Sequence, residues 1–149
     1  MSFLPRTAKR GDRNGAPAPA GGTSNRTDHD SRHRAVTALA RSGEAANGAL
    51  LVSALEDEEF DIRWMAMKGL ILLGRDGAVP LLEELTVRPE SDRLRDSGRE
   101  VLRQMAVGWF GDALRPVLAA LRGSADDRTL SLAAYSAVRK LRRFQRRSR

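Results

Sequence analysis

The fold of this chain is decided by residues 51–74, which read LVSALEDEEFDIRWMAMKGLILLG. Apolar side chains recur there at helical spacing: Ile62, Ala66 and Leu70 lie one turn apart and should form one buried face. Gly74 follows the last apolar residue, where a glycine commonly ends a helix. The segment therefore predicts an α-helix that is preceded by a short helix and a tight acidic turn.

Length and composition exclude several classes of protein. The chain has 149 residues, 26 Lys+Arg against 19 Asp+Glu, and no cysteine. The absence of cysteine excludes a disulfide scaffold, a thiol catalyst and a Cys-ligated metal site. No apolar run approaches the roughly 20 residues that span a bilayer, and the first residues lack a secretory apolar segment. We therefore expect a cytoplasmic protein of one domain that is not embedded in a membrane.

The chain changes character near residue 31. Residues 1–30 are rich in Pro, Gly, Ala, Ser and Thr without any period, so they predict a disordered arm. From residue 31 on, strong helix formers dominate and glycines punctuate them. No stretch alternates apolar and polar residues as a strand does. The predicted helices cover residues 31–42, 45–55, 59–73, 76–87, 91–107, 112–122 and 126–144.

A repeat relates these helices. An arginine is followed three positions later by a small residue, and a leucine follows about one turn after that. The pattern is found at Arg32, Ala35 and Leu39, at Arg63, Ala66 and Leu70, and at Arg95, Gly98 and Leu102. A period of about 30 residues built from two helices is typical of a helical solenoid. The predicted fold is all-α, a helical-hairpin solenoid of about four helix pairs over residues 31–144.

These residues resemble the HEAT repeat, most closely the short bacterial type also called PBS-lyase HEAT-like. The resemblance covers about residues 31–144. It implies that Asp57 and Arg63 bond within the stack as a polar ladder, which Arg95 continues in the next repeat. Val87 stands in the place of the next aspartate, so we expect the ladder to weaken there. The motif indicates architecture and says little about function.

The leading hypothesis is a non-enzymatic scaffold or adaptor that binds a protein partner on the concave helix face. Glu83 and Glu84 follow an acidic turn, and an acidic groove there would attract a basic peptide or the chain's own basic end. Trp109 and Phe110 lie between two glycines in a predicted turn. They are candidates either to anchor a partner or to cap the end of the solenoid. The oligomeric state stays open.

The alternative hypothesis is nucleic-acid binding through residues 139–149, a basic C-terminal tail that overlaps the last helix and holds no acidic residue. Its cations would contact phosphates and Phe144 would stack on a base, with weak and salt-dependent affinity. The candidate residues are Arg139, Lys140, Arg142, Arg143, Arg146, Arg147 and Arg149.

An enzyme of the glycosylase or lyase type is the third alternative. HEAT-like DNA glycosylases use tryptophan, aspartate and arginine together, and Trp64 lies next to Arg63 and near Asp61. We interpret Trp64 instead as a core or inter-repeat tryptophan. His29 and His33 have the i,i+4 spacing of a metal pair, but we interpret their segment as an acidic helix start. The sequence contains no recognisable catalytic set, so we predict no catalytic residue, no cofactor and no metal.

Overall fold

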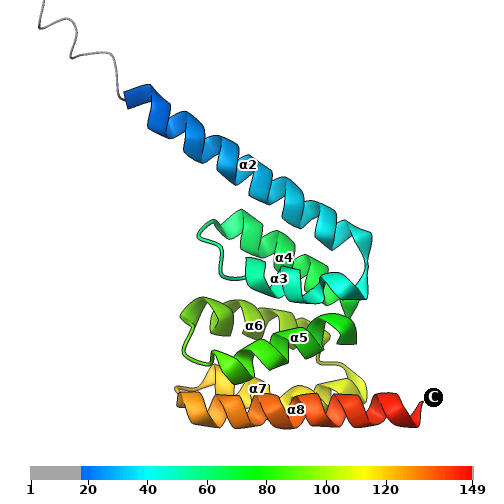
Figure 1. The fold of residues 1–149 in the computed structure, drawn as a ribbon. Coiled ribbons are helices and arrows are strands. Elements are labelled where there is room, and N and C mark those ends of the chain that lie inside the picture. Colours follow the sequence, from blue (N-terminus) through cyan, green and yellow to red (C-terminus); the bar gives the residue numbers. More distant parts are fainter. Residues whose placement is uncertain (1–17, 149) are drawn as a thin grey trace, which may run out of the picture. The chain divides into compact units, whose positions relative to one another are not determined.

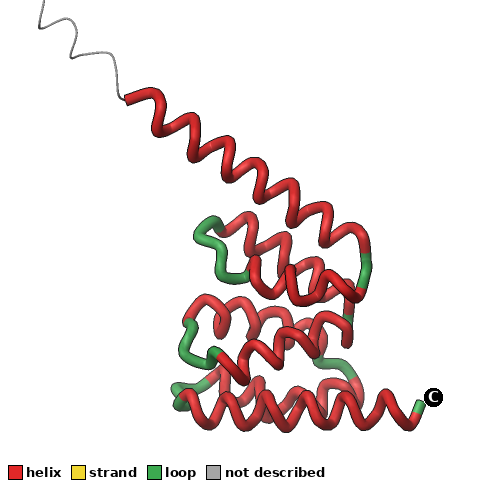
Figure 2. The backbone as a smooth tube through the Cα atoms, in the orientation of Figure 1, coloured by secondary structure: helices red, strands yellow, loops and turns green. Residues whose placement is uncertain are grey.

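The computed structural model describes residues 18–148 of the chain. These residues form α-helices joined by short loops, together with one 3-10 helix and no strand (Figures 1 and 2). The elements are α2 (Ala18–Ser42), η1 (Ala45–Asn47), α3 (Gly48–Ala54), α4 (Phe60–Leu73), α5 (Arg75–Val87), α6 (Asp92–Met105), α7 (Gly108–Arg122) and α8 (Asp127–Arg147). The predicted all-α helical-hairpin solenoid is confirmed.

The chain divides into two compact units between Arg32 and His33, within α2. In the first unit, the structure corrects the predicted disordered arm: residues 18–30 are helical, and residues 1–17 lie outside the described part. Asp28 and Arg32 form an i,i+4 ion pair there, and the Ser31 hydroxyl donates a hydrogen bond to a backbone carbonyl one turn earlier. Such local pairs stabilise an exposed helix. Because this segment has no apolar stripe, its sequence did not predict a helix.

The second unit, from His33 on, stacks its helices in two rows. One row contains α3, α5 and α8, and the other contains α4, α6 and α7 (Figure 1). Helices of the two rows also pack against each other, as α3 does against α4 and α5 against α6. Each helix pair therefore covers the apolar side of the next pair, as a solenoid requires.

The last helix pair departs from a regular stack. Strict repetition would place α7 beside α5 and α8 beside α6, but α8 packs on α5 and α7 packs on α6. The connection between α6 and α7 is only two residues long, which keeps these consecutive helices together. The buried face of α8 carries Ala134 and Ala137, and small residues of this kind allow a close helix neighbour. The Ser131 hydroxyl in α8 donates a hydrogen bond to the Thr86 carbonyl at the end of α5, at 2.7 Å.

The core is built mainly from leucine. The largest fully buried side chains are Leu51, Leu55, Ile62, Leu70, Leu81, Leu82, Leu85, Leu94, Leu102, Leu114, Leu130 and Leu141. They come from every helix of the second unit between α3 and α8, together with the residue that follows α3. Ile62, Ala66 and Leu70 form the buried face of α4 that the sequence predicts.

Glycines occupy the closest approaches between helices. A Cβ atom on Gly69 of α4 would lie 2.9 Å from the Ala40 and Leu51 side chains. On Gly77 of α5, it would lie 2.4 Å from the Leu70 carbonyl oxygen, which is part of a rigid backbone. On Gly98 of α6, by contrast, the nearest atom would be 3.5 Å away, an ordinary contact.

This contrast gives a matched pair of substitutions. We expect Gly77→Ala to lower the free energy of unfolding by roughly 1–3 kcal/mol, because the new methyl group collides with backbone. We expect Gly98→Ala to be neutral or to raise it by up to about 1 kcal/mol, because alanine favours the helix. Thermal and urea unfolding followed by circular dichroism measure both. Equal effects of the two substitutions would contradict the described packing.

Candidate interaction surfaces

The turn before α4 contains the first two predicted ladder residues. The Arg63 guanidinium donates hydrogen bonds to the backbone carbonyls of Asp57 and Glu58, each at 2.8 Å. The Asp57 carboxylate accepts a hydrogen bond from the backbone N–H of Glu59 at 3.0 Å. Asp57 and Arg63 therefore hold this turn closed.

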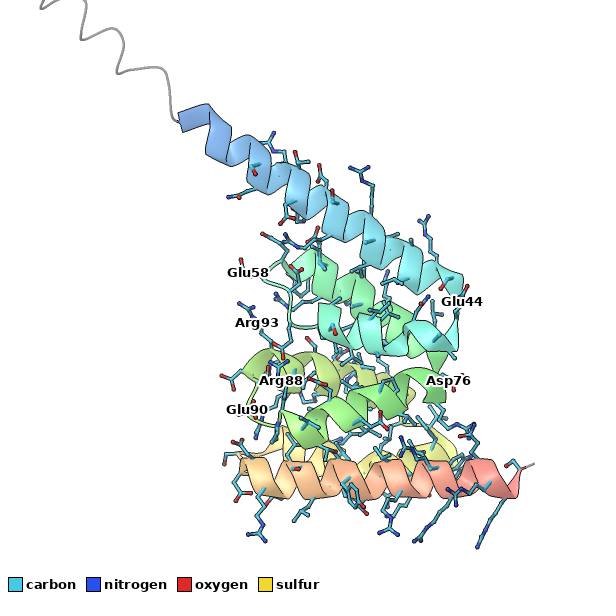
Figure 3. The ribbon with its side chains drawn as sticks, viewed as in Figure 1. Glu44, Glu58, Asp76, Arg88, Glu90 and Arg93 are labelled. Atoms are coloured by element: carbon cyan, nitrogen blue, oxygen red, sulfur yellow. The ribbon has the colours of Figure 1, made fainter. Side chains whose placement is uncertain are left out.

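Glu56 links this turn to the turn between α5 and α6. The Ser91 hydroxyl donates to Glu56 Oε1 at 2.5 Å, and the Arg88 guanidinium lies 3.3 Å from the same oxygen. Arg93 donates to the Glu56 backbone carbonyl at 3.0 Å. Figure 3 shows Arg88 and Arg93 on the same edge of the unit as Glu58. The repeat pattern places the polar link at Asp57, whereas the side chain that makes it is Glu56, one position earlier.

Arg95 extends these polar contacts to the turn between α7 and α8. Its guanidinium donates hydrogen bonds to the backbone carbonyls of Pro89 and Ala125, the latter at 3.1 Å. It also forms an ion pair with Asp127 at 2.7 Å, at the start of α8. The polar contacts therefore continue past Val87, where the sequence led us to expect a weakening.

The predicted acidic residues of α5 already have cations beside them. Glu83 pairs with Arg142, a residue of the predicted basic tail. The Glu84 carboxylate lies 3.4 Å from the Arg88 guanidinium, one turn later. The chain's own basic end therefore reaches the acidic pair, and less negative charge is left there for a partner.

Trp109 and Phe110 lie in the first turn of α7, which begins four residues before its predicted start. Gly108, with a φ of 60°, ends the connection from α6 and lets the helix begin there. Phe110 packs against the core, whereas Trp109 remains 46% exposed. The Trp109 ring contacts Phe110 edge to face, with centroids 5.8 Å apart, and stacks on Phe144 of α8 at 4.1 Å. Phe110 therefore belongs to the core, whereas Trp109 forms part of the surface between α7 and α8.

Two hollows adjoin Trp109. An apolar groove of about 460 Å³ is lined by Ile71, Leu73, Gly74, Arg75, Asp76, Gln104, Met105, Trp109 and Phe110. On α7 and α8, a second hollow of about 410 Å³, here called the basic groove, is lined by Trp109, Asp112, Ala113, Lys140, Arg143, Phe144 and Arg147. The basic groove thus contains three of the predicted tail cations together with Phe144.

The other tail cations lie outside this groove. Arg139 extends over the Tyr135 ring, 5.9 Å from its centroid, and Arg142 pairs with Glu83. Arg146 is exposed on the last turn of α8, and Arg149 lies outside the described residues. The tail is therefore helical up to Arg147, and its cations point to several surfaces.

A third hollow was missed in the sequence. The Trp64 groove, of about 350 Å³, lies between α4 and α6 and is lined by Phe60, Arg63, Trp64, Met67, Asp96, Ser97 and Glu100. Trp64 is 41% exposed, so it is not a core residue, and its position between α4 and α6 fits the inter-repeat interpretation. Its ring stacks with Phe60 at 6.3 Å and lies under the Lys68 ammonium at 5.2 Å. Phe60, Trp64 and Lys68 follow one another at i,i+4 spacing, so they lie on one side of α4. Because this side ends in a lysine, the spacing could have indicated an exposed face.

The residues of the glycosylase and metal hypotheses are engaged in other contacts. The Arg63 guanidinium is bound to backbone carbonyls, and Asp61 accepts from the N–H of Ile62 at 2.9 Å. His29 lies beside Asp30 at 3.4 Å in the first unit, and His33 lies 3.9 Å from Asp61 in the second. Both histidines lie inside α2, so the helix-start interpretation of this segment is wrong because α2 begins much earlier.

Two carboxylates have shifted pKa values. Hydrogen bonds from Thr129 lower the pKa of Asp126, which caps the N-terminus of α8 by accepting the Thr129 N–H at 2.9 Å. Hydrogen bonds from Arg103 and then Gln104 lower the pKa of Glu100, at the edge of the Trp64 groove. Both groups therefore stay ionised at neutral pH.

In the described part of the chain, no helix combines the length and apolarity needed to cross a bilayer. A family model described as HEAT repeats matches residues 22–103, more than half of the chain. Neither the curated proteins nor the solved structures contain a match to this chain. The matched segment includes α3, α4, α5 and most of α6.

The lowered pKa of Asp126 predicts a pH effect on stability. Its carboxylate stabilises the fold fully above the ordinary carboxyl range, and this contribution is lost as the pH falls through the lowered pKa, below about pH 4. Asn also caps helices but does not titrate. We therefore expect Asp126→Asn to flatten the fall of Tm between about pH 5 and about pH 2.

Thermal unfolding by circular dichroism across this pH range measures the effect. The matched control is Asp96→Asn, an exposed acid of α6 that caps no helix. If both variants follow the wild-type profile, Asp126 has no stabilising role as an ionised cap.

Proposed function

Because the chain belongs to the HEAT-repeat family, we propose that it is a non-enzymatic scaffold that holds a peptide segment of a protein partner in the Trp64 groove. HEAT repeats typically serve as protein-interaction scaffolds, which supports this class of function. The groove lies between α4 and α6, two helices of one row of the stack. We expect the protein to act in the cytoplasm.

The exposed aromatic pair of α4 is the observation that carries the proposal. Phe60 is 63% and Trp64 41% exposed, although both rings are large enough to cover much apolar surface. They stack on each other and adjoin a hollow whose floor includes the buried Met67. Tryptophan is enriched among the few residues that dominate binding energy at protein interfaces. A partner's apolar side chain would therefore find a preformed hollow here.

The charges in the groove indicate the chemistry of the partner segment. Asp96 is exposed and has no hydrogen bond or ion pair with another described residue. Glu100 is ionised and shares its carboxylate with Arg103 and Gln104. Of the described cations near the groove, Arg63 is bound to backbone carbonyls of its own turn, and Lys68 lies over the Trp64 ring. A segment with an apolar anchor followed by Lys or Arg fits this arrangement.

Selection of peptides from a random library of about 12 residues tests the proposal. We expect the enriched peptides to share an aromatic or large aliphatic residue close to a basic one. Trp64→Ala should weaken their binding at least about tenfold, because the ring supplies the main contact area. Asp96→Asn should weaken it about two- to fivefold, and more so at low salt. Calorimetric titration with synthetic peptides measures these changes.

Leu132→Ala is the matched control, since Leu132 is an apolar side chain of α8 that is 59% exposed and far from α4 in the sequence. It should leave peptide affinity unchanged. Thermal unfolding of each variant shows whether the fold is intact. Peptides that bind Trp64→Ala as tightly as wild type, or a selection that enriches none, would contradict the proposal.

A further inference from the structure

The basic groove brings together three cations from one face of α8. Lys140, Arg143 and Arg147 follow one another at spacings of three and four residues, so they lie along one side of the helix over about 10 Å. All three side chains are exposed. The three positive charges therefore form a line along α8 and are not scattered around the end of the helix.

These cations keep their charge among the residues that the structure describes. None of the three forms an ion pair with a carboxylate of the described residues. The groove contains one acid, Asp112, whose carboxylate is paired with Arg115 at 2.5 Å. By contrast, Arg142 on another side of α8 pairs with Glu83. The groove therefore keeps its positive charge for an external anion.

Two aromatic rings border the same cations. Trp109 is 46% and Phe144 43% exposed, and the rings stack with centroids 4.1 Å apart. The stack joins the start of α7 to the last turns of α8. Flat, partly exposed rings beside a strip of cations are what single-stranded nucleic-acid sites use: the cations contact the backbone and the rings stack on bases.

We propose that the basic groove binds single-stranded nucleic acid, with Lys140, Arg143 and Arg147 on successive phosphates and a base on the Trp109–Phe144 pair. A base-paired duplex offers no exposed base face to these rings. An anionic membrane fits less well, because a helix that lies on a bilayer needs a continuous exposed apolar face. The apolar face of α8, including Leu130, Val138 and Leu141, is buried in the core.

Fluorescence anisotropy with labelled oligothymidylate and oligouridylate of about 15 nucleotides tests this assignment. We expect micromolar binding at low salt and a logarithmic salt slope of about 2, since each of three phosphate contacts contributes about 0.7. The combined variant Lys140→Ala, Arg143→Ala and Arg147→Ala should lose at least about tenfold in affinity. The duplex of the same sequence should bind more weakly than the single strand.

The matched control removes the same charge from other sides of α8. The combined variant Arg128→Ala, Arg139→Ala and Arg146→Ala should lose no more than about threefold, because these residues do not line the groove. Thermal unfolding must show that both combined variants fold. Equal losses in the two variants would overturn the proposal, since they would show that net charge alone attracts the strand.

Tryptophan emission gives a second, independent measurement. Trp64 and Trp109 are the two tryptophans, so Trp64→Phe leaves Trp109 as the sole reporter. A base that stacks on Trp109 should quench its emission in proportion to binding. Binding without quenching would overturn the assignment of the rings. Binding to vesicles rich in phosphatidylserine, with none to oligonucleotides, would overturn the assignment of the ligand.

Discussion

No helix pair of the second unit can bury its apolar side alone, and the rest of the structure depends on this constraint. Leucines such as Leu51, Leu81 and Leu130 come from successive pairs and are fully buried in one core. Burial of each such side chain is worth about 1.5–3 kcal/mol, whereas an exposed ion pair such as Arg142–Glu83 contributes less than about 1 kcal/mol. Stability therefore comes from the shared leucine core, and most surface charges can change with little effect on the fold.

The length of α8 explains how the basic groove arises. α8 packs on both α5 and α7, and its last fully buried side chain is Leu141. The helix nevertheless continues to Arg147, so its final turns have no core to cover. Their side chains extend beside the start of α7, where Phe144 meets Trp109. The groove is thus a consequence of a terminal helix that is longer than the core it caps.

The repeat pattern in the sequence was enough to predict the stack, because the spacing of small residues and leucines follows directly from helix packing. Ala66 illustrates this, since it is fully buried on the same face of α4 as Ile62 and Leu70. The exchange of α7 and α8 was not predictable from the sequence. It depends on whether the apolar face of α8 packs on α5 or on α6, and the sequence pattern is the same in both cases. The helical start of α2 was not predicted for a different reason. The ion pair Asp28–Arg32 stabilises this part of the helix, and no apolar periodicity in the sequence indicates it. The exposure of Trp64 was not predictable, because a tryptophan among apolar residues is usually buried.

The two proposed sites differ in charge and share no residue. The Trp64 groove on α4 and α6 has Asp96 and Glu100 for a basic segment, and the basic groove on α7 and α8 has cations for a polyanion. Exposed charges alone would distinguish these ligands poorly, because physiological salt screens them beyond about 8 Å. Each groove, however, also contains a stacked pair of aromatic rings, whose contact with a ligand is not screened by salt. The charges then select the sign of the ligand as it approaches, and the rings determine whether it stays bound.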